Sequence, residues 1–176
     1  KNGEVTEESV TNLADALGGP DTFNVMPGYY GVYVGEKGNT QFIKSWDGSV
    51  RPIFGAFNRG GSDVTAQYLT AARATKSKNS QATVLHANFT DVQGIAAADP
   101  KLIPNAAYNK VMSYDDALAL GAEVLHHRVF DIARKYNTPI LVRRSFAQNE
   151  NGEFLKEFDP REKGTFVKER CSPEDY

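Results

Sequence analysis

The sequence predicts an α/β fold with a mainly parallel sheet, because helical and strand patterns alternate along the chain. Residues 62–75 combine apolar residues at helical spacing with several alanines and no proline. The apolar pattern of residues 82–88 is typical of a strand. A second helical stretch, residues 115–136, leads to the short apolar run of residues 139–142, which we predict to be a buried strand.

The first part of the chain adds a helix and two hairpin turns to this pattern. Thr6 is a candidate N-cap followed by two glutamates, and apolar residues at helical spacing continue until a pair of glycines. We therefore predict a helix over residues 6–17. Aromatic and β-branched residues dominate residues 23–57, and turn signals interrupt them at residues 36–39 and at residues 47–48.

Two stretches have a less defined pattern. Residues 115–136 favour either one helix or two consecutive helices. Residues 148–176 are rich in charged residues, glycine and proline, with only scattered phenylalanine, which is too polar for a core of their own. We interpret this last stretch as a linker or an end of the domain.

The composition restricts the class of function. A formal net charge of −2 over 176 residues provides no strong positive field, so we expect no nucleic-acid partner. The single cysteine, Cys171, has no partner for an intrachain disulfide, which fits a reducing compartment, and we expect a cytoplasmic protein. No apolar run approaches the roughly 20 residues needed to span a bilayer, and residues 1–9 do not resemble a signal peptide. We therefore expect no membrane association.

The first candidate site is the run Arg59-Gly60-Gly61-Ser62-Asp63, between a predicted strand and a predicted helix. The glycines let the backbone approach a ligand closely, and the free N–H groups at a helix N-terminus favour an anion. Arg59 could clamp a carboxylate in bidentate fashion, and Asp63 could orient a lysine or a metal-bound phosphate. The alternative is an ordinary glycine turn followed by a Ser or Asp N-cap, which is the commoner cause of such a run.

The second candidate site follows the strand predicted at residues 82–88. Thr90 and Asp91 stand where ligands collect in open α/β sheets, at the carboxyl end of a strand, and could hold a ribose hydroxyl or a purine edge. Lys101, a little further along the chain, could meet a phosphate. The alternative is an Asx-type turn closed by Gly94 and a second turn at Asp99-Pro100, which the local sequence alone favours.

The pair His126-His127 is a third candidate, for a metal. Adjacent residues on a helix point about 100° apart, so the two imidazoles would not converge on one ion. A third ligand of suitable type is also missing nearby. We therefore expect no metal site at this pair.

Taken in order, five blocks of the sequence resemble successive motifs of the aspartokinases, which belong to the amino-acid kinase superfamily. The blocks are residues 57–63, 88–101, 112–117, 121–126 and 136–143. Their order is more specific than any single block, and the resemblance extends over about residues 25–167. It implies part of a three-layer α/β/α amino-acid-kinase fold, with residues 1–167 as the C-terminal half of a kinase domain and residues 168–176 as a polar tail or linker.

The resemblance also implies an activity: transfer of the γ-phosphoryl group of ATP to the side-chain carboxylate of L-aspartate, the first step towards lysine, threonine and methionine. ATP and Mg²⁺ are the implied co-substrate and metal. The implied substrate-binding residues are Arg59, Gly60, Gly61 and Ser62, with Asp63 as the catalytic residue. The implied nucleotide-binding residues are Thr90, Asp91, Gly94 and Lys101.

The chain departs from the family pattern in several places. The family's opening Lys-Phe-Gly-Gly-Thr-Ser block, whose lysine neutralises the phosphates, is absent. Ala96 and Glu123 stand where the family usually has a tyrosine near the nucleotide and a lysine near the phosphates, and Asn58 replaces a common glycine. We therefore expect weak ATP binding and no turnover by this chain alone. We expect either a homo-oligomer or a second chain that supplies the N-terminal half. The alternative is a non-catalytic, aspartokinase-like structural or interaction subunit.

Overall fold

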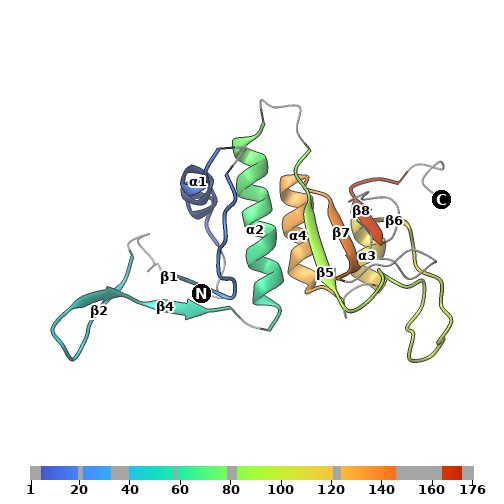
Figure 1. Ribbon diagram of the computed structural model, residues 1–176, viewed down its shortest axis with the longest axis horizontal. Coiled ribbons are helices and arrows are strands. Elements are labelled where there is room, and N and C mark those ends of the chain that lie inside the picture. Colours follow the sequence, from blue (N-terminus) through green and yellow to red (C-terminus); the bar gives the residue numbers. More distant parts are fainter. Residues whose placement is uncertain are drawn as a thin grey trace.

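The computed structural model describes residues 5–19, 22–32, 40–57, 59–78, 83–120, 124–145 and 164–171. Figure 1 shows a body of helices packed beside a sheet, with a narrow arm of β-strands extending from one side. The helices of the described part are α1 (Glu7–Ala16), α2 (Gly61–Lys76), α3 (Tyr114–Leu120) and α4 (His127–Tyr136). The strands there are β1 (Tyr30–Val32), β2 (Phe42–Lys44), β3 (Val50–Pro52), β4 (Phe54–Ala56), β5 (His86–Thr90), β6 (Val111–Ser113), β7 (Ile140–Arg144) and β8 (Thr165–Lys168).

The main sheet has four described strands in the order β5-β7-β8-β6. β5 runs parallel to β7 and β6 runs parallel to β8, whereas β7 and β8 are antiparallel. Two of the three pairings are parallel, and helices separate strands along the chain, as in α/β proteins. The predicted α/β fold with a mainly parallel sheet is confirmed.

One face of this sheet carries the main core. Side chains from the strands, among them Ile140, Val142 and Val167, are fully buried against α2, α3 and α4. Val129 and Phe130 of α4 lie in the same cluster. Burying one such side chain completely contributes about 1.5–3 kcal/mol, so this cluster fixes the helices against the sheet. The ends of these helices are therefore held at defined places relative to the strand ends.

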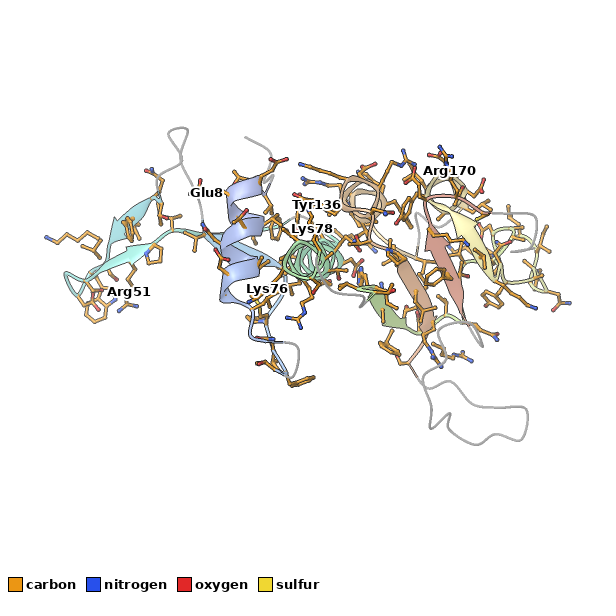
Figure 2. The ribbon with its side chains drawn as sticks, turned by 90° about the horizontal axis from the view of Figure 1, so that it is seen from above. Glu8, Arg51, Lys76, Lys78, Tyr136 and Arg170 are labelled. Carbon is orange, nitrogen blue, oxygen red and sulfur yellow. The ribbon has the colours of Figure 1, made fainter. Side chains whose placement is uncertain are left out.

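The helix α1 covers the outer side of α2. Val10 and Ala14 of α1 pack against Ala71 and Ala72 of α2 in a second cluster, and Figure 2 shows α1 beside α2 when the molecule is seen from above. Thr6 caps α1, because its Oγ1 accepts a hydrogen bond from the Ser9 N–H at 3.1 Å. The helix predicted over residues 6–17 is confirmed.

Two antiparallel ribbons, β1 with β4 and β2 with β3, build the arm. The turn predicted at residues 47–48 joins β2 to β3, where Gly48 has φ 79° and its N–H donates to the Ser45 carbonyl at 2.9 Å. A left-handed φ of this kind favours glycine in a tight turn. The other predicted turn, at residues 36–39, lies outside the described residues.

Several boundaries differ from the prediction. The strand expected at residues 82–88 is β5, His86–Thr90, because pairing starts where β7 begins, with His86 opposite Ile140. The stretch 115–136 contains two helices, α3 and α4. None of the helices in the described part is long and apolar enough to cross a membrane.

The interpretation of residues 148–176 as a linker or an end is wrong for residues 165–168. These residues form β8, which lies between β7 and β6 inside the sheet. Thr165 and Val167 are completely buried, and the residues between and after them are half-buried. Because alternate residues of a strand face opposite sides, two buried side chains are enough to join a polar segment to the core.

Candidate functional site

The loop Arg59-Gly60-Gly61-Ser62-Asp63 forms the N-terminus of α2. Gly60 is the N-cap, with φ 80° and ψ 9°, and it supplies no side chain to cap the helix. The Ser or Asp N-cap of the alternative interpretation is therefore wrong. Arg59 and Ser62 are exposed, and the Ser62 hydroxyl lies 3.4 Å from Asp63 Oδ1. The N–H groups of the first turn have no partner within the helix and can receive an anion.

The two glycines of this loop are packed against different side chains. A Cβ atom added to Gly60 would lie 2.6 Å from His126 Cβ, and one added to Gly61 would lie 2.4 Å from Phe57 Cβ. Real Cβ atoms do not approach side chains this closely, so any larger residue would displace the loop or its neighbours. The loop is therefore held between Phe57, at the base of the arm, and His126, at the start of α4.

Hydrogen bonds attach the base of the arm to α2. The Tyr29 N–H donates to Thr65 Oγ1 at 3.1 Å, and the Phe57 N–H donates to the Tyr29 carbonyl at 2.7 Å. A Cβ on Gly28 would lie 3.3 Å from Ser62 Cα, so this glycine also lies directly against the loop. The arm and the helix N-terminus thus form one connected unit.

The second predicted site begins at the end of β5. Thr90 Oγ1 donates to Asp91 Oδ1 at 3.0 Å. The Thr90 carbonyl accepts from the Ser145 N–H at 2.8 Å, and the Asp91 carbonyl accepts from Arg144 Nε at 3.1 Å. The backbone of this turn is thereby fixed to the end of β7, while the Asp91 side chain stays exposed. An exposed carboxylate at the carboxyl end of a strand is available to a ligand.

The structure leaves no room for a side chain at Gly94. It is buried, and a Cβ added to it would lie 2.6 Å from Thr165 Oγ1 on β8. The next residue, Ile95, donates its N–H to the same hydroxyl at 2.7 Å. The turn after β5 is therefore fixed to β8.

Lys101 is exposed on the long connection between β5 and β6, the two edge strands of the sheet. Its N–H donates to Asp99 Oδ1 at 2.9 Å, as expected for the turn predicted at Asp99-Pro100. Ala96 pairs with Tyr108 across an isolated antiparallel bridge on the same connection. Figure 1 shows this yellow-green connection on the far side of the sheet from α2, so the connection does not lie beside the start of that helix.

The start of α2 and the end of β5, which carry most of the other predicted residues, lie on the same side of the molecule. In Figure 1 the lower end of α2, where Gly61 begins the helix, lies at the same level as the end of β5, where Thr90 stands. The chain reverses direction between α2 and β5, which brings the start of one to the end of the other. Asn58 and Glu123, two of the departures from the family pattern, are outside the residues that the structure describes.

The prediction that His126 lies within a helix is wrong. It is the N-cap of α4, with extended backbone, and its Nδ1 accepts from the Arg128 N–H at 3.4 Å. The rings of His126 and His127 have centroids 4.3 Å apart, so helical spacing does not separate them. Within the described ranges, no group of three or more His, Cys, Asp or Glu side chains could hold a metal ion. The sequence did not predict the contact of His126 with Gly60, because the two residues are far apart along the chain and no local pattern indicates the contact.

Charges around His126 act in opposite directions. Burial lowers the pKa of the His126 imidazole, and His127 and Arg128 lower it further. The Asp63 carboxylate acts the other way and raises the pKa of His126, since a nearby negative charge favours the imidazolium. The Asp63 carboxylate therefore acts on the His126 imidazole.

A buried polar network fixes α2 to the sheet behind the site. His86 Nδ1 donates to Gln67 Oε1 at 2.7 Å, and Gln67 Nε2 donates to Thr138 Oγ1 at 2.6 Å. The Tyr114 hydroxyl donates to the Thr138 carbonyl at 3.0 Å. Burial lowers the pKa of His86 to about 4, so the imidazole is neutral at pH 7. A buried hydrogen-bond network of this kind fixes α2 in one position relative to the sheet.

A separate cavity of about 470 Å³ lies near the other end of α2. Leu17, Leu69, Arg73 and Leu85 are among its lining residues. Arg73 Nη1 donates to the Gly18 carbonyl at 2.9 Å there. This cavity is remote from the loop at Gly60, because the two lie at opposite ends of the same helix.

Comparison with known proteins gives a consistent result. The model of the amino acid kinase family matches residues 32–144. An aspartokinase of Geobacillus stearothermophilus is 39% identical over 102 residues, which is 56% of this chain and 23% of that protein. Aspartokinase 2 of Bacillus subtilis is 32% identical over 172 residues, which is 95% of this chain and 35% of that protein. The chain thus spans about a quarter to a third of the length of these relatives.

Solved structures agree with these relatives. The crystal structure of E. coli aspartokinase III in complex with aspartate and ADP has a TM-score of 0.50 and 25% identity, over 76% of this chain and 25% of that chain. The same enzyme in complex with lysine and aspartate has a TM-score of 0.50 and 26% identity, over 83% of this chain and 25% of that chain. The resemblance carried by the five sequence blocks is confirmed.

Proposed function

Because the chain belongs to the amino acid kinase family and its relatives there are aspartokinases, we propose that it carries the L-aspartate-binding half of an aspartate kinase site. The reaction would transfer the γ-phosphoryl group of ATP to the side-chain carboxylate of L-aspartate. The observation that carries this proposal is the loop from Arg59 to Asp63, held at the start of α2 between Phe57 and His126.

The loop has the chemistry that a small dicarboxylate needs. Arg59 is exposed and offers a planar guanidinium that can bind a carboxylate through two parallel hydrogen bonds. The free N–H groups after Gly60 and the positive end of α2 favour a second negative group, such as the phosphoryl in transfer. The E. coli aspartokinase III structure, which contains aspartate and ADP, supports this choice of ligands.

The transfer depends on positioning and neutralisation of charge. A side-chain carboxylate oxygen of L-aspartate forms the new bond to the γ-phosphorus while the bond to the bridging oxygen of ADP breaks, and no proton has to move. The transition state is loose and anionic, so fixed N–H groups near the transferring phosphoryl stabilise it. We assign Gly60, Gly61 and Ser62 to these contacts and Asp63 to the organisation of the catalytic groups.

We assign the nucleotide to the turn after β5. Thr90 and Asp91 are at the carboxyl end of a strand, where nucleotides bind in open α/β sheets, and Gly94 and Lys101 follow on the same connection. No cluster of three acidic or histidine ligands occurs among the described residues. We therefore expect Mg²⁺ to keep several of its water ligands and to bind mainly through the phosphates of ATP. The ion would neutralise part of the charge of these phosphates.

A non-catalytic role is the second candidate function. The opening lysine block of the family does not occur in this sequence, and Ala96 replaces the usual aromatic residue. On this account the chain would act as a structural or interaction subunit. On the first account, the phosphate-binding lysine is supplied from outside these 176 residues. Binding of L-aspartate at Arg59 distinguishes the two.

Calorimetric titration of the 176-residue chain with L-aspartate tests the proposal. We expect saturable binding that Arg59→Gln weakens at least tenfold, because a hydrogen bond to a charged group contributes about 1.5–3 kcal/mol. Arg51→Gln is the matched control, since Arg51 is an exposed arginine on the arm, well away from α2 (Figure 2). The proposal fails if the wild-type chain does not bind L-aspartate, or if both variants bind it equally well.

A further inference from the structure

His126 lies between the start of α4 and the loop at the start of α2. It precedes the first residue of α4, and its Nδ1 accepts the N–H of Arg128 at 3.4 Å, which caps that helix. An imidazole that accepts at Nδ1 carries its proton on Nε2 and is neutral. The cap therefore belongs to the neutral form of His126.

The same side chain forms one wall of the α2 loop. A Cβ on Gly60 would lie 2.6 Å from His126 Cβ and 2.8 Å from its Cδ2. The side chain thus packs directly on the left-handed backbone of Gly60, while Phe57 packs on the neighbouring Gly61. The backbone N–H groups proposed to receive the phosphoryl are aligned by this contact.

Protonation changes what His126 can do. The imidazolium has N–H donors at both ring positions, so it can no longer accept from Arg128. The Asp63 carboxylate on α2 favours the positive form, whereas His127 and Arg128 on α4 oppose it. The neutral ring holds the start of α4, and the charged ring is drawn towards Asp63.

We propose that His126 is a positioning residue for the Gly60–Asp63 loop, fixing its backbone through Gly60 and moving Asp63 when its own imidazole changes protonation. The identity of the ligand rests on the proposed function, but the positioning concerns residues of this chain alone. Binding of L-aspartate and phosphoryl groups at the loop would then depend on pH through a side chain that touches neither ligand.

Nuclear magnetic resonance titration of the full chain between pH 5 and 8 tests this inference. We expect the amide signals of Gly60 and Gly61 to titrate with the same midpoint as the His126 imidazole. Asp63→Asn lowers that midpoint, because it removes the charge that raises the pKa of His126. His126→Asn removes the titration of the loop amides, although asparagine is itself a good N-cap and keeps α4 capped. His127→Asn is the matched control and leaves the loop titration in place.

A second measurement separates this inference from the proposed function. We expect His126→Asn to weaken L-aspartate binding about tenfold, which corresponds to about 1.4 kcal/mol. Loop amides that do not titrate with His126, or that titrate unchanged in His126→Asn, overturn the positioning role even if L-aspartate binds. If the loop titrates as expected and the wild-type chain does not bind L-aspartate, the positioning role stands and the proposed function fails.

Discussion

Gly60 combines two constraints at a single residue. Its backbone is left-handed, with φ 80°, and its missing side chain leaves the space that His126 occupies. Any L-residue with a Cβ pays about 1–2 kcal/mol for the left-handed conformation alone. Replacement of Gly60 therefore strains the backbone and also displaces the neighbouring imidazole.

We expect Gly60→Ala to destabilise the protein more than Gly48→Ala does. Gly48 has nearly the same φ, 79°, but an added Cβ meets nothing within 4 Å, so this variant measures the backbone cost alone. The difference between the two should be about 1–3 kcal/mol, the usual cost of overpacking. Urea unfolding of both variants measures it, and equal stabilities would mean that His126 moves away without cost.

His86 makes stability depend on pH. Its folded pKa is about 4 because it is buried, against an ordinary value near 6.5. The unfolded chain therefore binds a proton that the folded chain does not, and stability falls as the pH decreases from about 6.5 to 4. At about 1.4 kcal/mol for each pKa unit, the total loss is about 3 kcal/mol.

Unfolding experiments at several pH values between 4 and 7.5 check this dependence. His86→Asn should remove most of the slope, because asparagine does not titrate, while the exposed His127→Asn should leave it unchanged. A slope that persists in His86→Asn would assign the acid sensitivity to another group.

Roles that depend on neighbouring residues in the sequence could be predicted. Roles that depend on contacts between elements far apart in the sequence could not. The glycines and charges at residues 59–63 indicated a loop before a helix, because both features are local. His126 contacts Gly60 only through the packing of α4 beside α2, and nothing in its neighbours reports that contact. The same holds for Thr165, which receives the N–H of Ile95 from a distant turn.

At the scale of elements, β8 shows why a polar segment can still be a core strand. Only Thr165 and Val167 are completely buried, and the strand exists because it pairs with β7 and β6. Strand formation depends strongly on such context, whereas the long helix α2 has a periodic pattern of its own. The prediction therefore succeeded for α2 and failed for β8.

Val167→Ala tests whether β8 contributes to the core. Removing two buried carbon atoms and leaving a cavity should cost about 2–3 kcal/mol in the free energy of unfolding. Arg170→Ala, at an exposed position just beyond the strand (Figure 2), should change stability by less than about 0.5 kcal/mol. An effect of Val167→Ala no larger than that of Arg170→Ala would show that β8 is dispensable.

Two departures from the family pattern, Ala96 after β5 and Glu123 between α3 and α4 in the sequence, determine the prediction for nucleotide affinity. Ala96 offers no ring for stacking, which costs about 1 kcal/mol, and Glu123 would repel phosphate by about 1 kcal/mol or more where a lysine would attract it. We expect weak or undetectable ATP binding by the chain and at least a tenfold gain in Ala96→Tyr combined with Glu123→Lys. Calorimetric titration with ATP and magnesium measures both, and tight binding by the unmodified chain would show that these residues are wrongly assigned.

At the scale of the whole molecule, the order of the sequence blocks was the most informative signal. The blocks indicated the family, which the family model then matched over residues 32–144, and the family implied the fold class. The arrangement around the site required the structure, since it depends on the arm, α2 and α4 meeting at Gly60 and Gly61. The assignments of Thr90, Asp91, Gly94 and Lys101 to the nucleotide stay predictions.

The central claim is that this chain holds the aspartate side of a kinase site and lacks the lysine that neutralises the phosphates. A group of that kind typically contributes a factor of about 10² to 10³ in rate, and nothing in the described residues replaces it at the α2 loop. Mixing the chain with a second polypeptide that carries the opening segment of a related aspartokinase should supply this lysine and restore turnover.

The decisive measurement is ADP release at saturating L-aspartate and ATP, with and without that second polypeptide. We predict no measurable turnover by the 176-residue chain or by the second polypeptide alone, aspartate-dependent turnover by the mixture, and loss of that turnover with Arg59→Gln but not with Arg51→Gln. Robust aspartate-dependent turnover by the chain alone, or a mixture in which Arg59→Gln is as active as the unmodified chain, would contradict this account.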